Sequence, residues 1–132
     1  MTTSKIIQGR CRWASVSSPN TKFNPIYSIE VEIPMDTYND YLEQGFPVKE
    51  DVGFYMAIKR RFKKGKPLLF DHNKNPTTVM IGNGSLVRVQ YQEYEFENVY
   101  GMHRGFELEA VQILELMRHE NNVLLENFLI DA

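Results

Sequence analysis

The sequence predicts a mainly β fold, a small antiparallel barrel of five or six strands with one short helix between the second and third strands. Segments of alternating apolar and polar residues recur along the chain, and turn signals rich in glycine, proline, asparagine and serine separate them. Within residues 1–117, only one segment changes to helical spacing. Chains with this pattern form barrels or sandwiches, and strands of 10–12 residues favour a barrel because they can bend around it.

The first half of the chain supplies two strands and the helix. Residues 6–16 are rich in strand-forming side chains and end at the turn sequence SSPN. Residues 26–34 alternate most clearly, and Pro34 ends that strand. Apolar side chains at 35–45 then recur at helical spacing, and a glycine at 45 is expected to end the helix.

The second half predicts three or four further strands. Alternation resumes at 53–62, and a tight loop around Gly65 would let 67–71 return as its hairpin partner. Residues 85–96 form a long alternating strand, and 106–116 form the last one. The aromatic side chains whose register predicts a place in the core are Phe54, Tyr91 and Phe106.

Length and composition restrict the function classes. A chain of 132 residues is expected to form one domain with a real core. No apolar run approaches the roughly 20 residues that cross a bilayer, and the first residues lack the apolar core of a signal peptide, so we expect a cytoplasmic protein. The single cysteine, Cys11, excludes an internal disulfide and a zinc site built on several cysteines. No cofactor is predicted.

Positive charge is concentrated in one short stretch of a chain whose net charge is −2. Six of the eight residues at 59–66 are lysine or arginine, and residues 89–132 hold 2 basic against 9 acidic side chains. A basic strand end and turn could follow a phosphate backbone, or it could simply be a solvated hairpin. Alternation puts Arg60 inward unless a bulge intervenes, so its direction stays open. The outward basic candidates are Lys59, Arg61, Lys63, Lys64 and Lys66.

Several aromatic residues sit at positions that do not suit a core. Trp13 lies between Arg12 and a serine-rich turn, and its place in a stack or in the core stays open. Aromatic rings beside basic residues are what sequence-tolerant binding of single-stranded nucleic acid needs, because every base offers a face for stacking. The candidates for stacking are Trp13, Tyr55, Tyr94 and Phe96.

The sequence contains none of the common catalytic motifs. The three histidines have no ligand-like spacing, and no phosphate-binding loop or nucleophile elbow is present. Glu93, Glu95 and Glu97 lie on one strand face and could hold Mg²⁺ in a small nuclease. Such a row is more often a solvated sheet face or a protected edge. We therefore expect a protein that is not an enzyme.

Four stretches, in order, resemble the single-stranded DNA-binding proteins of podovirus-type tailed phages, which have an OB-fold. The helix between the second and third strands also suits this family. No one stretch is diagnostic, but together they cover most of residues 5–117. The stretches are VSSPNTKFNPIYSIEVEIP, FYMAIKRRF followed by LLFD, IGNGSLVRVQYQEYEF, and GFELEAVQILEL.

The resemblance implies binding of single-stranded DNA without strong sequence preference, during phage DNA replication and recombination in the cytoplasm of the infected bacterium. It implies that the basic stretch and the aromatic candidates form the DNA face, and that Arg88 on the next strand joins them. The resemblance also suggests that the barrel forms a homodimer, but the sequence alone does not determine the oligomeric state. A phage adaptor or inhibitor that binds a host or replisome protein stays open as the alternative.

The chain departs from the family at its end. Members usually finish with a strongly acidic tail that contacts the phage polymerase or helicase, whereas residues 118–132 are partly hydrophobic with few charges. We expect residues 1–117 to form the OB-fold domain and 118–132 a tail or arm that docks on the domain or contacts a partner. Phe128 and Leu129 are the candidates for partner binding.

Overall fold

The computed structural model describes residues 3–20 and 25–117, which form seven strands, one α-helix and one 3₁₀ turn. The helix lies between the second and third strands of the barrel, as the sequence predicts. The elements are β1 (Ser4–Asn20), β2 (Ile26–Glu32), α1 (Met35–Gln44), β3 (Val48–Glu50), β4 (Phe54–Arg61), η1 (Phe62–Lys64), β5 (Leu68–Phe70), β6 (Leu86–Asn98) and β7 (Gly101–Glu115).

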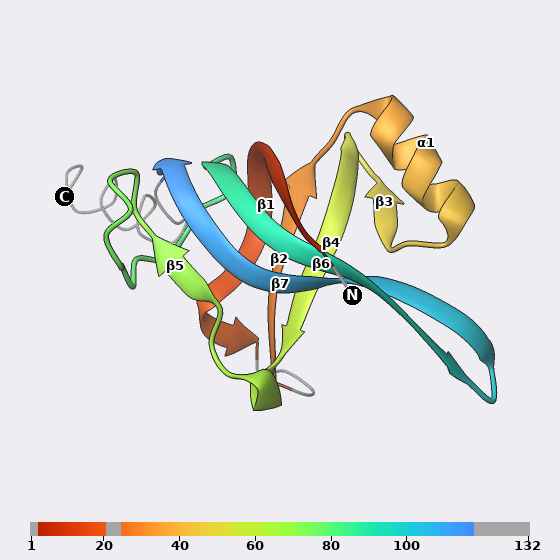
Figure 1. Cartoon of the computed structure of the whole chain (residues 1–132). Coiled ribbons are helices and arrows are strands. Elements are labelled where there is room, and N and C mark those ends of the chain that lie inside the picture. Colours follow the sequence, from red (N-terminus) through yellow and green to blue (C-terminus); the bar gives the residue numbers. More distant parts are fainter. Residues whose placement is uncertain (1–2, 21–24, 118–132) are drawn as a thin grey trace, which may run out of the picture.

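Five of the strands close into a barrel (Figure 1). Antiparallel pairing joins β4, β2, β1, β6 and β7 in that order, and a parallel contact between β4 and β7 at Lys59 and Glu107 completes the circle. The short strands β3 and β5 extend the sheet at its two ends. The predicted mainly β barrel is therefore confirmed.

The long strand β1 belongs to both halves of the barrel. Its first residues, 4–10, pair with β6, and its later residues pair with β2. Gly9 lies at the change of partner, where a Cβ atom would come within 2.6 Å of the carbonyl oxygen of Glu32. Only glycine allows so close an approach of two strands, and the strand can therefore turn the corner of the barrel here.

The barrel interior is filled by the inward side chains of all five strands. Tyr91 and Phe106 are buried and Phe54 packs against the core, so the predicted core positions are confirmed. Helix α1 contributes Tyr41, whose ring meets that of Phe106 edge-on at 4.8 Å, and Tyr38, whose ring lies 4.7 Å from that of Phe54. The helix ends at Gly45, which adopts a left-handed conformation. No helix in the described residues is long and apolar enough to span a bilayer.

The predicted hairpin between 53–62 and 67–71 is wrong. β4 ends at Arg61, η1 turns the chain, and β5 pairs in parallel with β7 instead of returning along β4. Pro67 has no backbone N–H for a hairpin ladder with β4. Lys63 therefore lies in the turn rather than on the outward face of a strand.

The hairpin of β6 and β7 extends well beyond the barrel (Figure 1). Its tip is open to solvent, with Val99 and Tyr100 almost fully exposed. Its base stays in the barrel through the pairing of β6 with β1. The hairpin thus projects aromatic side chains over one side of the molecule.

Candidate functional site

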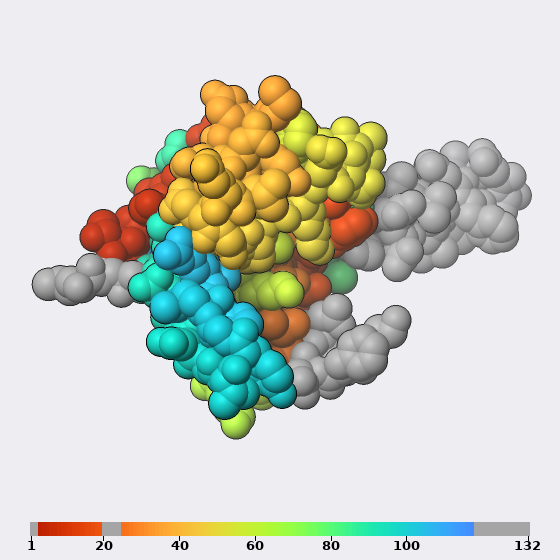
Figure 2. Space-filling view, turned by 90° about the vertical axis from the view of Figure 1, so that its right-hand side faces the viewer, coloured from red at the N-terminus to blue at the C-terminus, as the bar shows by residue number. Residues whose placement is uncertain are grey.

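One cavity of about 460 Å³ gathers five of the predicted site residues. Lys59, Arg61 and Lys64 line it from the end of β4 and η1, and Tyr94 and Phe96 line it from β6. We call it the hairpin cavity. Figure 2 shows the β6–β7 hairpin standing forward beside the recessed ends of β4 and β2. The remaining lining residues are Ile26, Gln92 and Glu107.

Two further cavities continue the hairpin cavity across the barrel. The middle cavity, about 440 Å³, shares Ile26 and Lys59 with the hairpin cavity and reaches Trp13. The third, about 380 Å³, shares Trp13 with the middle one and reaches Tyr55. Because neighbouring cavities share lining residues, the three form one track from Phe96 to Tyr55, which we call the groove.

Three aromatic rings stack in a row at the hairpin end of the groove. The ring centroids of Tyr94 and Phe96 lie 6.2 Å apart and those of Phe96 and His103 lie 5.0 Å apart, and the ring planes are nearly parallel, at 19° and 22°. Tyr94 and Phe96 remain 44% exposed. Gly105 faces Tyr94 across the hairpin, and a Cβ atom there would lie 2.5 Å from Cζ of the tyrosine. The missing side chain therefore lets the Tyr94 ring lie against the backbone.

A second aromatic group lies at the other end of the groove. The guanidinium of Arg12 stands 3.9 Å from the centroid of the Trp13 ring and 3.6 Å from that of Tyr55. Carboxylates of Glu30 and Asp51 each accept a hydrogen bond of 2.9 Å from this guanidinium. Burial lowers the pKa of Arg12, but these hydrogen bonds outweigh it and raise the pKa. The cation is thus fixed under the tryptophan.

The backbone at Trp13 explains why its ring faces outward. A bulge in β1 between Arg12 and Ser15 puts Trp13 at a φ of 51°, which is uncommon for a bulky residue. Its N–H donates to Oδ1 of Asn83 at 2.7 Å. The side chain is 55% exposed, so Trp13 is a surface residue and not part of the core.

The basic side chains in and around the groove differ in whether they form ion pairs. Lys64 forms an ion pair with Glu107. Among the described residues, no ion pair engages Lys59 or Arg61, and both are exposed on the outward face of β4. Lys63 and Lys66 are exposed around the turn after β4 and do not line the three cavities.

Arg60, whose direction the sequence left open, serves the turn rather than the groove. Its guanidinium donates to the carbonyl oxygens of Lys64 and Gly65, both at 2.8 Å, and to that of Leu108 at 3.1 Å. These bonds fasten the turn after β4 to β7. Arg60 therefore holds the basic segment in place beside Tyr94.

The structure does not bring Arg88 to the groove. It lies on the outside of β6 in a separate cavity, and its Nη2 donates to Oε1 of Gln8 at 3.2 Å. Sequence reasoning missed Arg12, which lines the groove, and His103, which stacks on Phe96 at the hairpin end. Arg12 is next to Trp13, so strict alternation would separate them, and only the bulge brings both to one surface.

The row of glutamates does not form a metal site in the described residues, where no three His, Cys, Asp or Glu side chains come together. Glu93 accepts hydrogen bonds from Lys5 at 2.7 Å and Tyr41 at 2.8 Å, and Glu95 pairs with Arg104 at 3.2 Å. Burial raises the pKa of Glu93, but these two donors outweigh it, so the pKa is lowered overall.

The remaining predictions concern Cys11 and the C-terminal residues Phe128 and Leu129. Cys11 is buried in the core, and burial raises the pKa of its thiol to about 11, which disfavours the thiolate. Phe128 and Leu129 lie outside the described residues, so their predicted contact with a partner stays a prediction.

The architecture is similar to that of solved phage proteins. No protein-family model and no curated protein sequence matches the chain. The structure of "Single-stranded DNA-binding protein from bacteriophage Enc34" superposes with a TM-score of 0.67 at 15% identity, over 89% of this chain and 83% of that one. The same protein in complex with ssDNA gives 0.66 at 15% identity, over 89% of both chains.

A second phage protein gives the same result. The structure of gp2.5, a single-stranded DNA-binding protein encoded by bacteriophage T7, superposes with a TM-score of 0.60 at 18% identity, over 87% of this chain and 88% of that one. At identities this low, the superpositions show a shared fold and no more. The order of the strands around the barrel is that of an OB-fold. This chain therefore has the OB-fold of the phage single-stranded DNA-binding proteins that it was expected to resemble.

Proposed function

We propose that this chain binds single-stranded DNA in the groove, without sequence preference. The observation that carries the proposal is the meeting of Lys59 and Arg61 with the Tyr94–Phe96 stack in one cavity. OB-folds bind oligonucleotides on the face of their second and third strands, between the loops after the first and fourth strands. In this barrel those strands are β2 and β4, and the β6–β7 hairpin carries the later loop.

The chemistry of the groove suits the backbone and bases of a single strand. Lys59 and Arg61 offer charges that carry no ion pair within the described part of the chain, so phosphates can approach them without displacing a carboxylate. Tyr94, Phe96 and Trp13 are each about half exposed, so their rings are accessible to bases, and a base stacked on an aromatic ring contributes roughly 1–3 kcal/mol. Stacking is tolerant of base identity, which is why little sequence preference is expected.

The biological role is also part of the proposal. Solved proteins that share this fold include the phage single-stranded DNA-binding proteins of Enc34 and T7, and this supports a non-enzymatic role in phage DNA replication and recombination inside the infected bacterium. Residues 1–117 would form the DNA-binding domain. The segment 118–132, with Phe128 and Leu129, would dock on the domain or serve association with a partner or with a second copy of the chain.

Fluorescence anisotropy tests the proposal directly. A labelled oligo-dT of about 30 nucleotides and a duplex of the same length are titrated with the full chain over a series of salt concentrations. We expect tight binding of the single strand, weaker binding of the duplex, and a log–log salt slope of about −0.7 per phosphate contacted. Absence of binding at low salt would contradict the proposal and favour an adaptor that uses the basic turn to bind a protein.

A further inference from the structure

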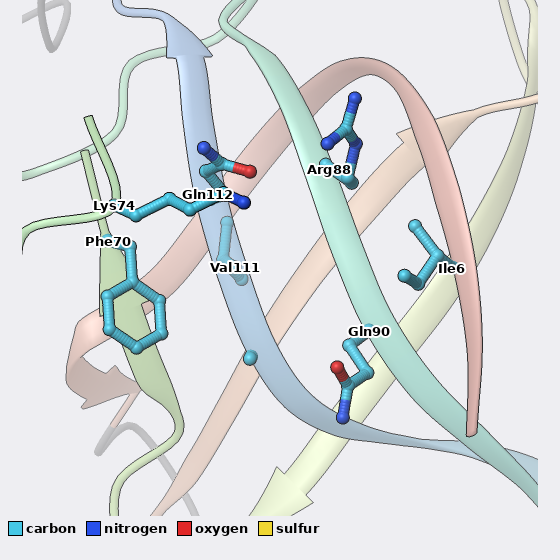
Figure 3. A pocket seen from close by; sticks show the side chains of 8 residues that line it. Ile6, Phe70, Lys74, Arg88, Gln90, Val111 and Gln112 are labelled. Atoms are coloured by element: carbon cyan, nitrogen blue, oxygen red, sulfur yellow. The ribbon is translucent and has the colours of Figure 1, made fainter. Parts of the chain in front are cut away.

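A separate cavity of about 330 Å³ opens on the outside of β1, β6 and β7 (Figure 3). It shares no residue with the groove. Strand β5 and the loop that follows it form one wall, so the cavity exists because β5 pairs with β7 rather than with β4. Its named side chains are Ile6, Phe70, Lys74, Arg88, Gln90 and Gln112.

The cavity has an apolar floor with one cation on each side. Ile6 is 63% exposed on one side of the cavity, and the ring of Phe70 borders the opposite wall (Figure 3). Lys74 extends over β7 from that wall, and Arg88 rises from β6. None of the lining residues is acidic. This combination fits a flat apolar ring that carries a negative charge.

The backbone holds Lys74 in place. Its φ is 64°, in the left-handed region, and its N–H donates to the carbonyl oxygen of Asp71 at 3.0 Å. The Asp71 carboxylate accepts the N–H groups of Asn73 at 2.9 Å and Asn75 at 3.0 Å. The loop therefore presents the lysine from a fixed position.

The two glutamines give the cavity a direction of hydrogen bonding. Nε2 of Gln90 donates to the carboxylate of Glu109 at 3.3 Å, and Nε2 of Gln112 donates to the carbonyl oxygen of His72 at 3.4 Å. Both partners can only accept, so the atom that faces each of them is the NH₂ nitrogen, and Oε1 lies on the other side of the amide. The Oε1 atoms remain as acceptors for a ligand that donates N–H groups.

We propose that this cavity binds one nucleotide unit whose base carries an exocyclic amino group. The base lies on the floor between Ile6 and Phe70, its phosphate contacts Lys74 and Arg88, and its amino group donates to a glutamine oxygen. Thymine and uracil present a carbonyl oxygen where cytosine has its amino group, so they are disfavoured. The unit is either a free nucleotide or one residue of a bound strand.

The first arm of the test uses free nucleotides on the full-length chain. ¹⁵N-labelled protein is titrated with dCMP, with dUMP, which has an oxygen in place of the amino group, and with inorganic phosphate. We expect dCMP to shift the backbone amides of Arg88, Gln90 and Gln112 and to bind at least threefold more tightly than dUMP. Phosphate alone should bind more weakly than either. Lys74→Ala with Arg88→Ala should remove the binding.

The second arm identifies the source of the nucleotide. Affinity for oligo-dC is compared with affinity for oligo-dU in the wild type, in the Lys74→Ala, Arg88→Ala variant and in a Lys59→Ala, Arg61→Ala variant that removes equal charge from the groove. If a strand occupies the cavity, the Lys74, Arg88 variant loses the preference for oligo-dC, and its salt slope falls by about 0.7 because one phosphate contact is lost. If only free nucleotide binds in the cavity, this variant keeps the full affinity for oligonucleotides and loses only the binding of dCMP.

The inference is overturned if the Lys74, Arg88 variant changes neither dCMP nor oligo-dC binding, or if cytosine and uracil ligands bind equally to the wild type. Both variants alter exposed side chains, so circular dichroism should show an unchanged fold. Because the dCMP arm does not involve the groove, its result is independent of the proposed binding of single-stranded DNA.

Discussion

The ring of Tyr94 lies against the backbone of Gly105, in the space that a side chain would otherwise fill. A Gly105→Ala substitution should push the ring away from Phe96 and weaken single-stranded DNA binding by up to about 1–3 kcal/mol, the energy of one stacked base. Anisotropy with oligo-dT measures this loss. In a Tyr94→Ala background the same substitution should cost little more, and a full additional loss there would show that the glycine acts in another way.

Trp13 should contribute to binding and not to folding. Trp13→Ala is expected to lower affinity by about 1–3 kcal/mol, roughly 5- to 150-fold. The melting temperature should change little, because the ring is exposed and its contact with Arg12 is worth about 1 kcal/mol at such a site. Trp13→Gly should lose the same affinity and be the more stable of the two variants, since glycine adopts a φ of 51° without strain. A large fall in the melting temperature for both would contradict this assignment.

Arg60 should act through the turn that it fastens. Arg60→Lys removes the planar fork that reaches the carbonyl oxygens of Lys64, Gly65 and Leu108, and should lower the free energy of unfolding by about 1–3 kcal/mol. Urea denaturation measures this change. Arg61→Lys is the matched control, because Arg61 points outward and its loss should change stability by less than about 0.5 kcal/mol. If the two substitutions lowered the free energy of unfolding equally, the proposed stabilisation of the turn by Arg60 would be contradicted.

Glu93 should make the fold sensitive to acid. Its pKa is lowered in the folded state, so the unfolded chain binds the proton more readily. The stabilisation from this carboxylate is fully present above its ordinary pKa of 4.5 and disappears as the pH falls through the lower folded value. Urea denaturation between pH 3 and pH 7 should show a shallower acid loss in Glu93→Gln than in the wild type. An identical pH profile would mean that Lys5 and Tyr41 do not stabilise the charged form.

The barrel could be predicted because its strands alternate strictly and because, within residues 1–117, helical spacing occurs in one place only. The core positions of Tyr91 and Phe106 follow from that alternation. The partner of 67–71 could not be predicted, since three residues of β5 carry too little pattern to choose between β4 and β7. The turn is instead fixed by a long-range contact of Arg60 with β7.

The candidate site was predictable where local sequence determines direction. Lys59, Arg61, Tyr94 and Phe96 alternate outward on their strands and meet because the barrel places β4 beside β7, the partner of β6 in the hairpin. Arg88 also points outward, but the barrel curves between it and the groove. The contact of Arg12 with Trp13 depends on a bulge between Arg12 and Ser15, and no residue type in that segment predicts where the bulge falls.

In the proposed complex, Lys59 and Arg61 contact the phosphates of single-stranded DNA. The most direct measurement is the salt dependence of oligo-dT binding in the Lys59→Ala, Arg61→Ala variant, with Lys59→Arg, Arg61→Lys as the control that keeps both charges. We predict that the log–log slope of the alanine variant is shallower by about 1.4, at about 0.7 per contact, and that the control retains the wild-type slope. An alanine variant with wild-type affinity and slope would contradict the account and place the DNA elsewhere.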